Sequence, residues 1–169
     1  MLLAIFGSVS ASRPAILVYI FEALSQEDTS PSQRALWAAL LTSISSANVY
    51  SLHAHAAQLI DATCSLPTLP PPSSRAVLRA LLPLVPLHVD FGRHLMLLLR
   101  KSLVAPDARA RAFAVEGFCT ILATDLLADE PDAIADVLLA LRSACRLSPS
   151  LQARAYRELA RPLAIGRPR

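Results

Sequence analysis

The stretch Val89–Val104, VDFGRHLMLLLRKSLV, carries the clearest structural signal in the chain. At about 100° per residue, its apolar and charged side chains separate onto opposite halves of a helix. The apolar half is expected to hold Val89, Phe91, Leu95, Met96, Leu98, Leu99 and Leu103. The polar half is expected to hold Asp90, Arg93, His94, Arg100 and Lys101, with Leu97 among them. The pattern predicts an amphipathic helix that packs through one face.

Helix start signals recur about every twenty residues in the rest of the chain. Most are Ser or Asp beside Pro, because the side-chain oxygen caps free N–H groups and Pro suits the first turn. Asn48 is interpreted as a further start signal. The predicted helices end near Ala23, Ser46, Cys64, Leu84, Val104, Leu127, Leu147 and Ala164. In the helix before Leu147, one face is expected to contain Ile134, Val137, Leu138 and Leu141.

About eight helices joined by short links predict an all-α fold of antiparallel helical hairpins, an α-solenoid of the HEAT or armadillo kind. Composition agrees, because 54% of the residues are hydrophobic, largely Ala and Leu, and only four are Gly. An irregular helical bundle is the alternative. The ends lack the polar caps that a solenoid needs, and the last helix runs into Gly166-Arg167-Pro168-Arg169. We therefore expect an interior piece of a longer protein.

The sequence contains no pattern typical of an enzyme, a metal site or a membrane span. Residues 35–60 lack charged side chains but are too rich in Ser, Thr, Asn and His for a bilayer. Cys64, Cys119 and Cys145 form no ligand or disulfide pattern and are expected to be buried free thiols. No Gly-rich phosphate loop or nucleophile motif is present, so neither a cofactor nor a metal is expected.

The basic residues are almost all arginine. The formal net charge is +3, and Lys101 is the one lysine in the sequence. Arg93, Arg100, Arg109 and Arg111 flank it and suit either DNA phosphates or a solvated or partner-facing surface. Leu97 lies four residues before Lys101, so the two are neighbours on a helix. It is either an ordinary exposed residue or the apolar centre of an interface.

Three stretches together resemble the Fanconi anaemia group I family. They are residues 79–87, residues 97–101 with the Leu-Arg-Lys triplet, and residues 107–118 with the Ala-Arg-x-x-Ala-Val-x-Gly-Phe motif. The last two stand at the family's separation without a gap. Residues 15–24 and 137–159 are weaker matches to an earlier helix and to the following helical domain. The resemblance implies that 1–122 is the second solenoid segment and 123–169 the start of the second helical domain.

The resemblance also implies a function. The family is a non-enzymatic nuclear scaffold for DNA interstrand cross-link repair that pairs with its D2 paralogue and clamps double-stranded DNA. The Fanconi core ligase attaches ubiquitin to one lysine, and the matching position is Lys101. The paralogue would meet Leu97, Arg93, Arg100 and His94, and DNA would meet Arg109 and Arg111. A generic helical-repeat adaptor unrelated to ubiquitin is the alternative.

One departure from the family concerns phosphorylation. The family has a long loop with Ser-Gln dipeptides after the helix that is expected to end near Leu127. This chain has only the short turn 128–132, whose acidic residues suit the start of the next helix. Ser25 and Ser32 each precede a glutamine in an earlier turn and are candidate phosphosites.

Overall fold

The computed structural model describes residues 1–26, 28–124 and 131–164, and within these ranges the chain is helical. The α-helices are α1 (Leu2–Ser8), α2 (Arg13–Ser25), α3 (Pro31–His53), α4 (Ala56–Thr63), α5 (Pro71–Leu81), α6 (Val89–Leu103), α7 (Ala108–Leu122), α8 (Pro131–Leu147) and α9 (Pro149–Ala164). Three short 3-10 turns, η1 (Ser10–Ser12), η2 (Leu66–Thr68) and η3 (Leu82–Leu84), join some of them. The prediction of an all-α fold is confirmed.

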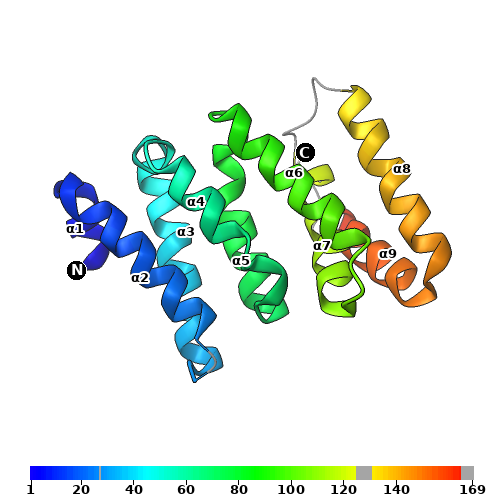
Figure 1. Cartoon of the computed structure of the whole chain (residues 1–169), viewed down its shortest axis with the longest axis horizontal. Helices are drawn as coiled ribbons and strands as arrows, with labels where there is room; N and C mark the ends of the chain where they lie inside the picture. The colour runs from blue at the N-terminus through cyan, green and yellow to red at the C-terminus, as the bar shows by residue number, and fades with distance from the viewer. Residues whose placement is uncertain (27, 125–130, 165–169) are drawn as a thin grey trace. The chain divides into compact units, whose positions relative to one another are not determined.

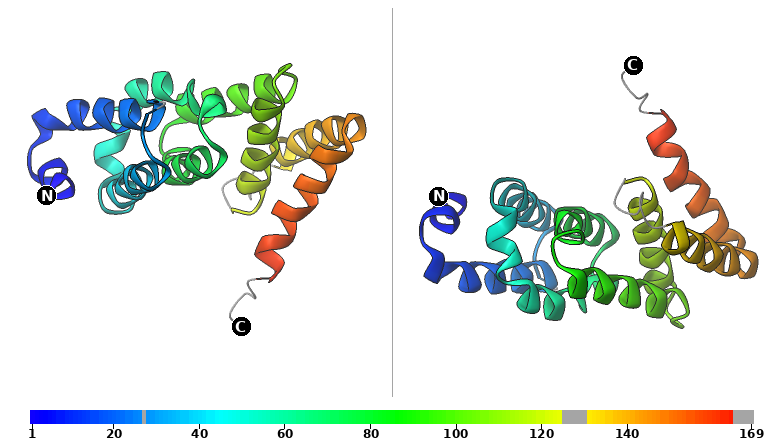
Figure 2. Two further views of the ribbon diagram at one scale, coloured as in Figure 1. Left: turned by 90° about the horizontal axis from the view of Figure 1, so that it is seen from below. Right: turned by 90° about the horizontal axis from the view of Figure 1, so that it is seen from above.

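The chain divides into two compact units, Met1–Leu95 and Met96–Arg169, so that α6 contributes to both. In the first unit, α3 packs against α2 and α5. Figure 1 shows successive helices of this unit side by side, and Figure 2 shows α2 and α4 in one layer with α3 and α5 in the other. Two layers of antiparallel helices are the α-solenoid arrangement expected from the short links.

In the second unit, α9 packs against both α7 and α8. Helix α7 is buried almost throughout its length, from Ala110 to Cys119 with only Arg111 less than fully buried. The small side chains of Ala110, Ala112, Ala114 and Gly117 allow this, because neighbouring helices can approach closely along such a segment. The resemblance placed a domain boundary between residues 122 and 123, whereas the two compact units meet between Leu95 and Met96. The domain boundary therefore stays a prediction.

Most helices begin where the sequence predicts. Ser30 accepts a hydrogen bond from the Gln33 backbone N–H (3.2 Å), and the Gln33 side chain accepts one from the Ser30 N–H (3.0 Å). This reciprocal pair is a capping box, which satisfies two free donors at the start of α3. Asp107 caps α7 by accepting from the Arg109 N–H at 3.0 Å. Helices α3, α5, α8 and α9 each have Pro as their first residue.

The predicted break at Asn48 is wrong, because α3 runs continuously to His53. Buried side chains continue at helical spacing on both sides of this position, at Leu41, Ile44 and Leu52. Packing of a continuous apolar face outweighs the modest preference of Asn for a helix start. The break comes instead at Ala54 and His55, where the His55 N–H bonds to the carbonyl of Leu52 (2.9 Å).

Three side chains lie elsewhere than expected. Val89 is 63% exposed because it is the first residue of α6, ahead of the packed face. Leu138 is 50% exposed, because α8 buries the narrower face around Val137 and Leu141. Cys64 is an exposed thiol just after α4, so the prediction that all three cysteines are buried is wrong for this one. Cys119 is buried and Cys145 partly buried, and all three are free thiols.

Two expectations fall partly outside the described residues. Helix α7 ends at Leu122 rather than near Leu127, and the short turn expected at 128–132 includes residues 128–130, which are not described. Asp132 does lie in the first turn of α8, where a carboxylate suits the positive end of the helix dipole. The terminal Gly166-Arg167-Pro168-Arg169 segment is likewise outside the described residues.

Candidate functional site

Helix α6 positions the candidate site through one buried face. Phe91, Leu95 and Leu99 are almost completely buried and follow one another at spacings of four residues. The imidazole Nδ1 of His88 accepts a hydrogen bond from the Phe91 N–H (3.1 Å) and so caps the start of the helix. The predicted bounds of 89–104 differ from the observed helix by one residue.

Lys101 lies in the last turn of α6, and its side chain is exposed. A cation at this end of a helix interacts favourably with the negative end of the helix dipole. An exposed lysine combines a flexible stem with a primary amine, the group that forms an isopeptide bond once deprotonated. The amine is therefore accessible from solvent.

Two exposed apolar side chains flank Lys101. Leu97, one turn before it, is 50% exposed, and Val104, just after the helix end, is 83% exposed. The spacing of four and then three residues places all three along one line of the surface, which we call the Lys101 row. Leu97 was expected here from the sequence. Val104 was missed, although its position seven residues after Leu97 was a usable signal.

Arg100 is engaged within the chain. Its Nη2 lies 3.1 Å from Oδ2 of Asp136 on α8, and both side chains are at least half exposed. An ion pair this exposed contributes at most about 1 kcal/mol because water and salt screen it. It nevertheless directs the guanidinium toward α8, which the sequence could not indicate for residues 36 positions apart.

The other expected interface residues, Arg93 and His94, lie one turn before Leu97 on α6. Arg93 is exposed and makes a long contact with Asp90 in its own helix (Nη1 to Oδ1 3.7 Å). His94 is partly buried, and its Nε2 lies 3.9 Å from Sγ of Cys64 at the end of α4. The structure therefore brings Leu97 and Lys101 together but turns His94 toward another helix.

The two arginines expected to meet DNA differ in their surroundings. Arg111 donates from Nη1 to the carbonyl oxygens of Ala105 (2.7 Å) and Pro106 (2.6 Å). These bonds hold the link between α6 and α7 in place, so part of the guanidinium is already used. Arg109 is exposed at the start of α7.

Ser25 and Ser32 are exposed, at the end of α2 and in the first turn of α3. The glutamine after Ser32 is Gln33, whose side chain belongs to the capping box described above. Recognition of this Ser-Gln dipeptide through the glutamine would require the capping box to open.

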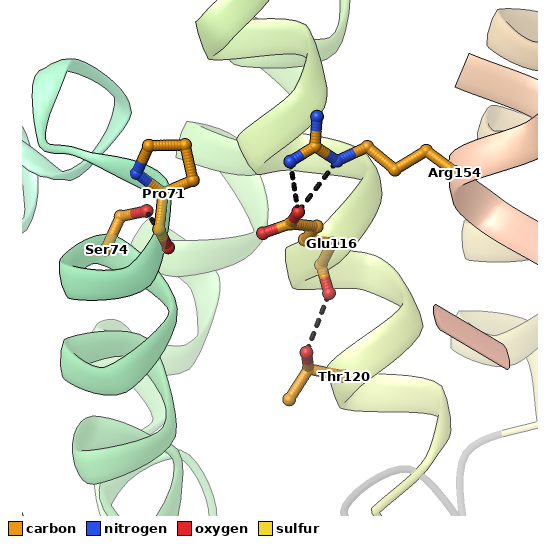
Figure 3. A network of polar contacts seen from close by, with 5 residues as sticks. All are labelled: Pro71, Ser74, Glu116, Thr120 and Arg154. Carbon is orange, nitrogen blue, oxygen red and sulfur yellow. Dashed lines mark hydrogen bonds and ion pairs between the residues drawn. The ribbon is translucent and has the colours of Figure 1, made fainter. Parts of the chain in front are cut away.

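A buried ion pair in the second unit was not expected from the sequence. The carboxylate of Glu116 on α7 accepts from Arg154 Nε (2.7 Å) and lies 2.5 Å from Arg154 Nη2 on α9 (Figure 3). The Glu116 side chain is only 4% exposed. The available signal was a single acidic residue within the apolar segment Phe113–Phe118, because buried carboxylates are paired.

The described ranges contain neither a metal-binding cluster nor a membrane-spanning helix. No group of three or more His, Cys, Asp or Glu side chains is arranged to hold a metal ion there. Within the same ranges, every helix is either too short or too polar for a membrane crossing.

Comparison with known proteins identifies the family. A family model described as FANCI solenoid 2 matches residues 1–119, about 70% of the 169-residue chain. The chain belongs to the FANCI family. Lys101 and its flanking apolar residues lie inside the matched range, and a search of curated proteins found no match.

The family assignment confirms the resemblance and the solenoid fold. A FANCI solenoid domain marks a protein of Fanconi anaemia interstrand cross-link repair, which places the family in the nucleus. The family assignment also favours a Fanconi anaemia repair protein over the alternative, a generic helical-repeat adaptor. The family is generally a non-catalytic scaffold, and membership suggests the D2 paralogue and DNA as partners.

Proposed function

We propose that this FANCI-family chain is a non-enzymatic scaffold whose Lys101 is monoubiquitinated by the Fanconi core ligase during interstrand cross-link repair. The observation that carries the proposal is the exposure of Lys101 in the last turn of α6, between Leu97 and Val104. Lys101 is also the one lysine in the sequence, so no other side chain in this chain offers a primary amine.

The acceptor is tested by ubiquitination of the full chain by the Fanconi core ligase, with the D2 paralogue and duplex DNA present. Lys101→Arg keeps the positive charge but removes the reactive amine, so we expect modification to be lost. The matched control is the double variant Lys101→Arg, Arg109→Lys, which returns an exposed amine nearby. If Lys101→Arg is modified as well as the parent, Lys101 is not the acceptor. If the double variant is modified, the ligase does not distinguish a lysine at position 101 from one at position 109.

Pairing with the D2 paralogue is proposed to use the Lys101 row. Leu97 supports this role because it is a half-exposed leucine among charged neighbours, the arrangement of an interface centre with a polar rim. Leu97→Asp is expected to weaken pairing in a pull-down assay and to leave helicity by circular dichroism unchanged. Retained pairing would show that Leu97 is only an exposed surface residue.

Contact with double-stranded DNA is proposed to involve Arg109 more than Arg111. The support is the exposure of Arg109 and the engagement of Arg111 with two carbonyl oxygens. Arg109→Gln should therefore weaken the binding of DNA by the paired complex. It should also make the remaining binding less dependent on salt concentration. Arg111→Gln should chiefly lower the melting temperature. The reverse assignment of these two effects would overturn the proposal.

Ser25 and Ser32 are proposed as phosphosites for DNA-damage kinases, on the basis of the Ser-Gln dipeptides and the exposure of both side chains. Phosphopeptide mass spectrometry after kinase treatment tests this. Because Gln33 takes part in the capping box, Ser32 is expected to be modified more slowly than Ser25. Equal rates would show that the kinase does not need the glutamine side chain.

A further inference from the structure

Helix α8 carries an exposed apolar and basic face that the proposed function does not use. The helix packs on α9 and α7 and buries Val137 and Leu141. Leu138 beside this buried face and Leu139 opposite it are 50% and 63% exposed. Two adjacent leucines at this exposure are unusual in a helix that already has a complete buried face, since exposed apolar side chains normally occur singly.

Two arginines extend this face toward the end of the helix. Arg142 and Arg146 follow Leu138 at intervals of four residues, so the three side chains form one row on the helix surface. Both arginines are exposed. We call Leu138, Leu139, Arg142 and Arg146 the α8 outer face.

The carboxylates of α8 leave this face positively charged. Asp136 is directed toward Arg100 of α6, and Asp132 lies in the first turn, at the other end of the helix. In the part of the chain that the structure describes, neither Arg142 nor Arg146 has an ion pair. The hydroxyl of Ser143, beside them, donates to the Leu139 carbonyl of its own helix (2.9 Å). The α8 outer face therefore offers two unpaired cations beside two leucines.

Several explanations of the α8 outer face can be compared. Basic residues in the last turn of a helix interact favourably with the helix dipole, but this does not account for the exposed leucines. Duplex DNA would pair with the arginines, but its phosphates would give the leucines no apolar surface to bury against. A second copy of the same face would bring four arginines together, and like charges oppose such contact. A protein segment with both acidic and apolar side chains satisfies both halves of the face.

We propose that the α8 outer face is a docking site for an acidic amphipathic helix of a partner protein. Leucine or similar side chains of the partner pack on Leu138 and Leu139. Its carboxylates, one helical turn away, pair with Arg142 and Arg146. Burial of the leucines contributes to the affinity, and the ion pairs select acidic over basic partners.

The test measures fluorescence anisotropy of two labelled synthetic peptides with the full chain. One peptide has Glu and Leu at helical i, i+4 spacing, and in the other Lys replaces every Glu. We expect the acidic peptide to bind and the basic peptide not to bind. Leu138→Ser together with Leu139→Ser should weaken binding about tenfold, because two apolar contacts are lost.

Charge reversal gives the second arm. Arg142→Glu with Arg146→Glu should abolish binding of the acidic peptide and create binding of the basic one. The control is Arg79→Glu on α5, an exposed arginine of the other compact unit, which should change neither. Circular dichroism checks that the variants, all at exposed positions, keep their helices.

Two results would overturn the proposal. If the two serine substitutions leave peptide binding unchanged, the leucines take no part and the attraction is only electrostatic. If duplex DNA binds the parent chain in a manner sensitive to Arg142→Glu and displaces the peptide, the face is a phosphate-binding surface instead.

Discussion

The ion pair between Glu116 and Arg154 offers the sharpest test of how α9 is held in the second unit. Nε and Nη2 of Arg154 lie 2.7 and 2.5 Å from the same carboxylate oxygen of Glu116. The carboxylate side is almost fully buried, whereas a third of the Arg154 side chain (33%) is exposed. The pair joins α7 to α9 (Figure 3), so its removal should loosen the attachment of the last helix.

The expected cost of Arg154→Met follows from this geometry. Breaking a buried ion pair by removal of one partner typically costs about 3–5 kcal/mol. Water can reach part of the Arg154 site, and Met keeps most of the apolar stem of the side chain in place. Both effects favour the low end of the range. We therefore expect a fall of about 3 kcal/mol in the free energy of unfolding.

Urea denaturation followed by far-ultraviolet circular dichroism measures this change. Arg157→Met, at an exposed position of the same helix, is the matched control and should alter stability by less than about 0.5 kcal/mol. A double-mutant cycle with Glu116→Gln should give a coupling energy of about 2 kcal/mol. If Arg154→Met costs no more than Arg157→Met, or the coupling is near zero, the pair does not hold α9 in place.

Three further substitutions test local features. Asp107→Ala removes the N-cap of α7 and should cost about 1 kcal/mol in urea denaturation. Gly92→Ala gains about 1 kcal/mol of helix propensity, but the new Cβ would lie 3.2 Å from Cγ1 of Val85. It should thus be nearly neutral alone and stabilising in a Val85→Ala background, and equal effects in both would contradict this. Burial, aided by nearby Glu158, raises the pKa of the Cys119 thiol from 9.0 to about 12. The neutral thiol is thereby favoured in the folded state, so this contribution to stability is complete below pH 9.0 and is lost as pH rises toward about 12. Unfolding free energies of the parent and Cys119→Ala should therefore converge over this interval, and a constant difference would refute the assignment.

Local signals account for the parts of the fold that the sequence predicted. The starts of α8 and α9 were predicted because a cap or proline coincides there with the start of a helical apolar period, whereas α6 was predicted from its apolar period alone. At Asn48 the helix-start preference of asparagine disagreed with the apolar period, which continues through α3. Packing of the continuous apolar face of α3 decided the outcome, and this depends on neighbouring helices that a local pattern does not contain.

The candidate site was predictable only in part, for the same reason. The exposed positions of Leu97 and Lys101 follow from helical spacing. The contacts of Arg100 with Asp136 and of His94 with Cys64 join residues at least 30 positions apart, and no local pattern specifies them. Two of the four residues expected at the paralogue interface are therefore engaged elsewhere.

These contacts change the chemical character expected of the surface around Lys101. From the sequence, that surface looked basic, with Arg93, Arg100 and Lys101 on one half of the helix. In the structure, Arg100 is directed to Asp136, while Leu97 and Val104 expose apolar area on both sides of the lysine. A partner that covers the Lys101 row thus gains mainly from burial of apolar surface, which salt screens little.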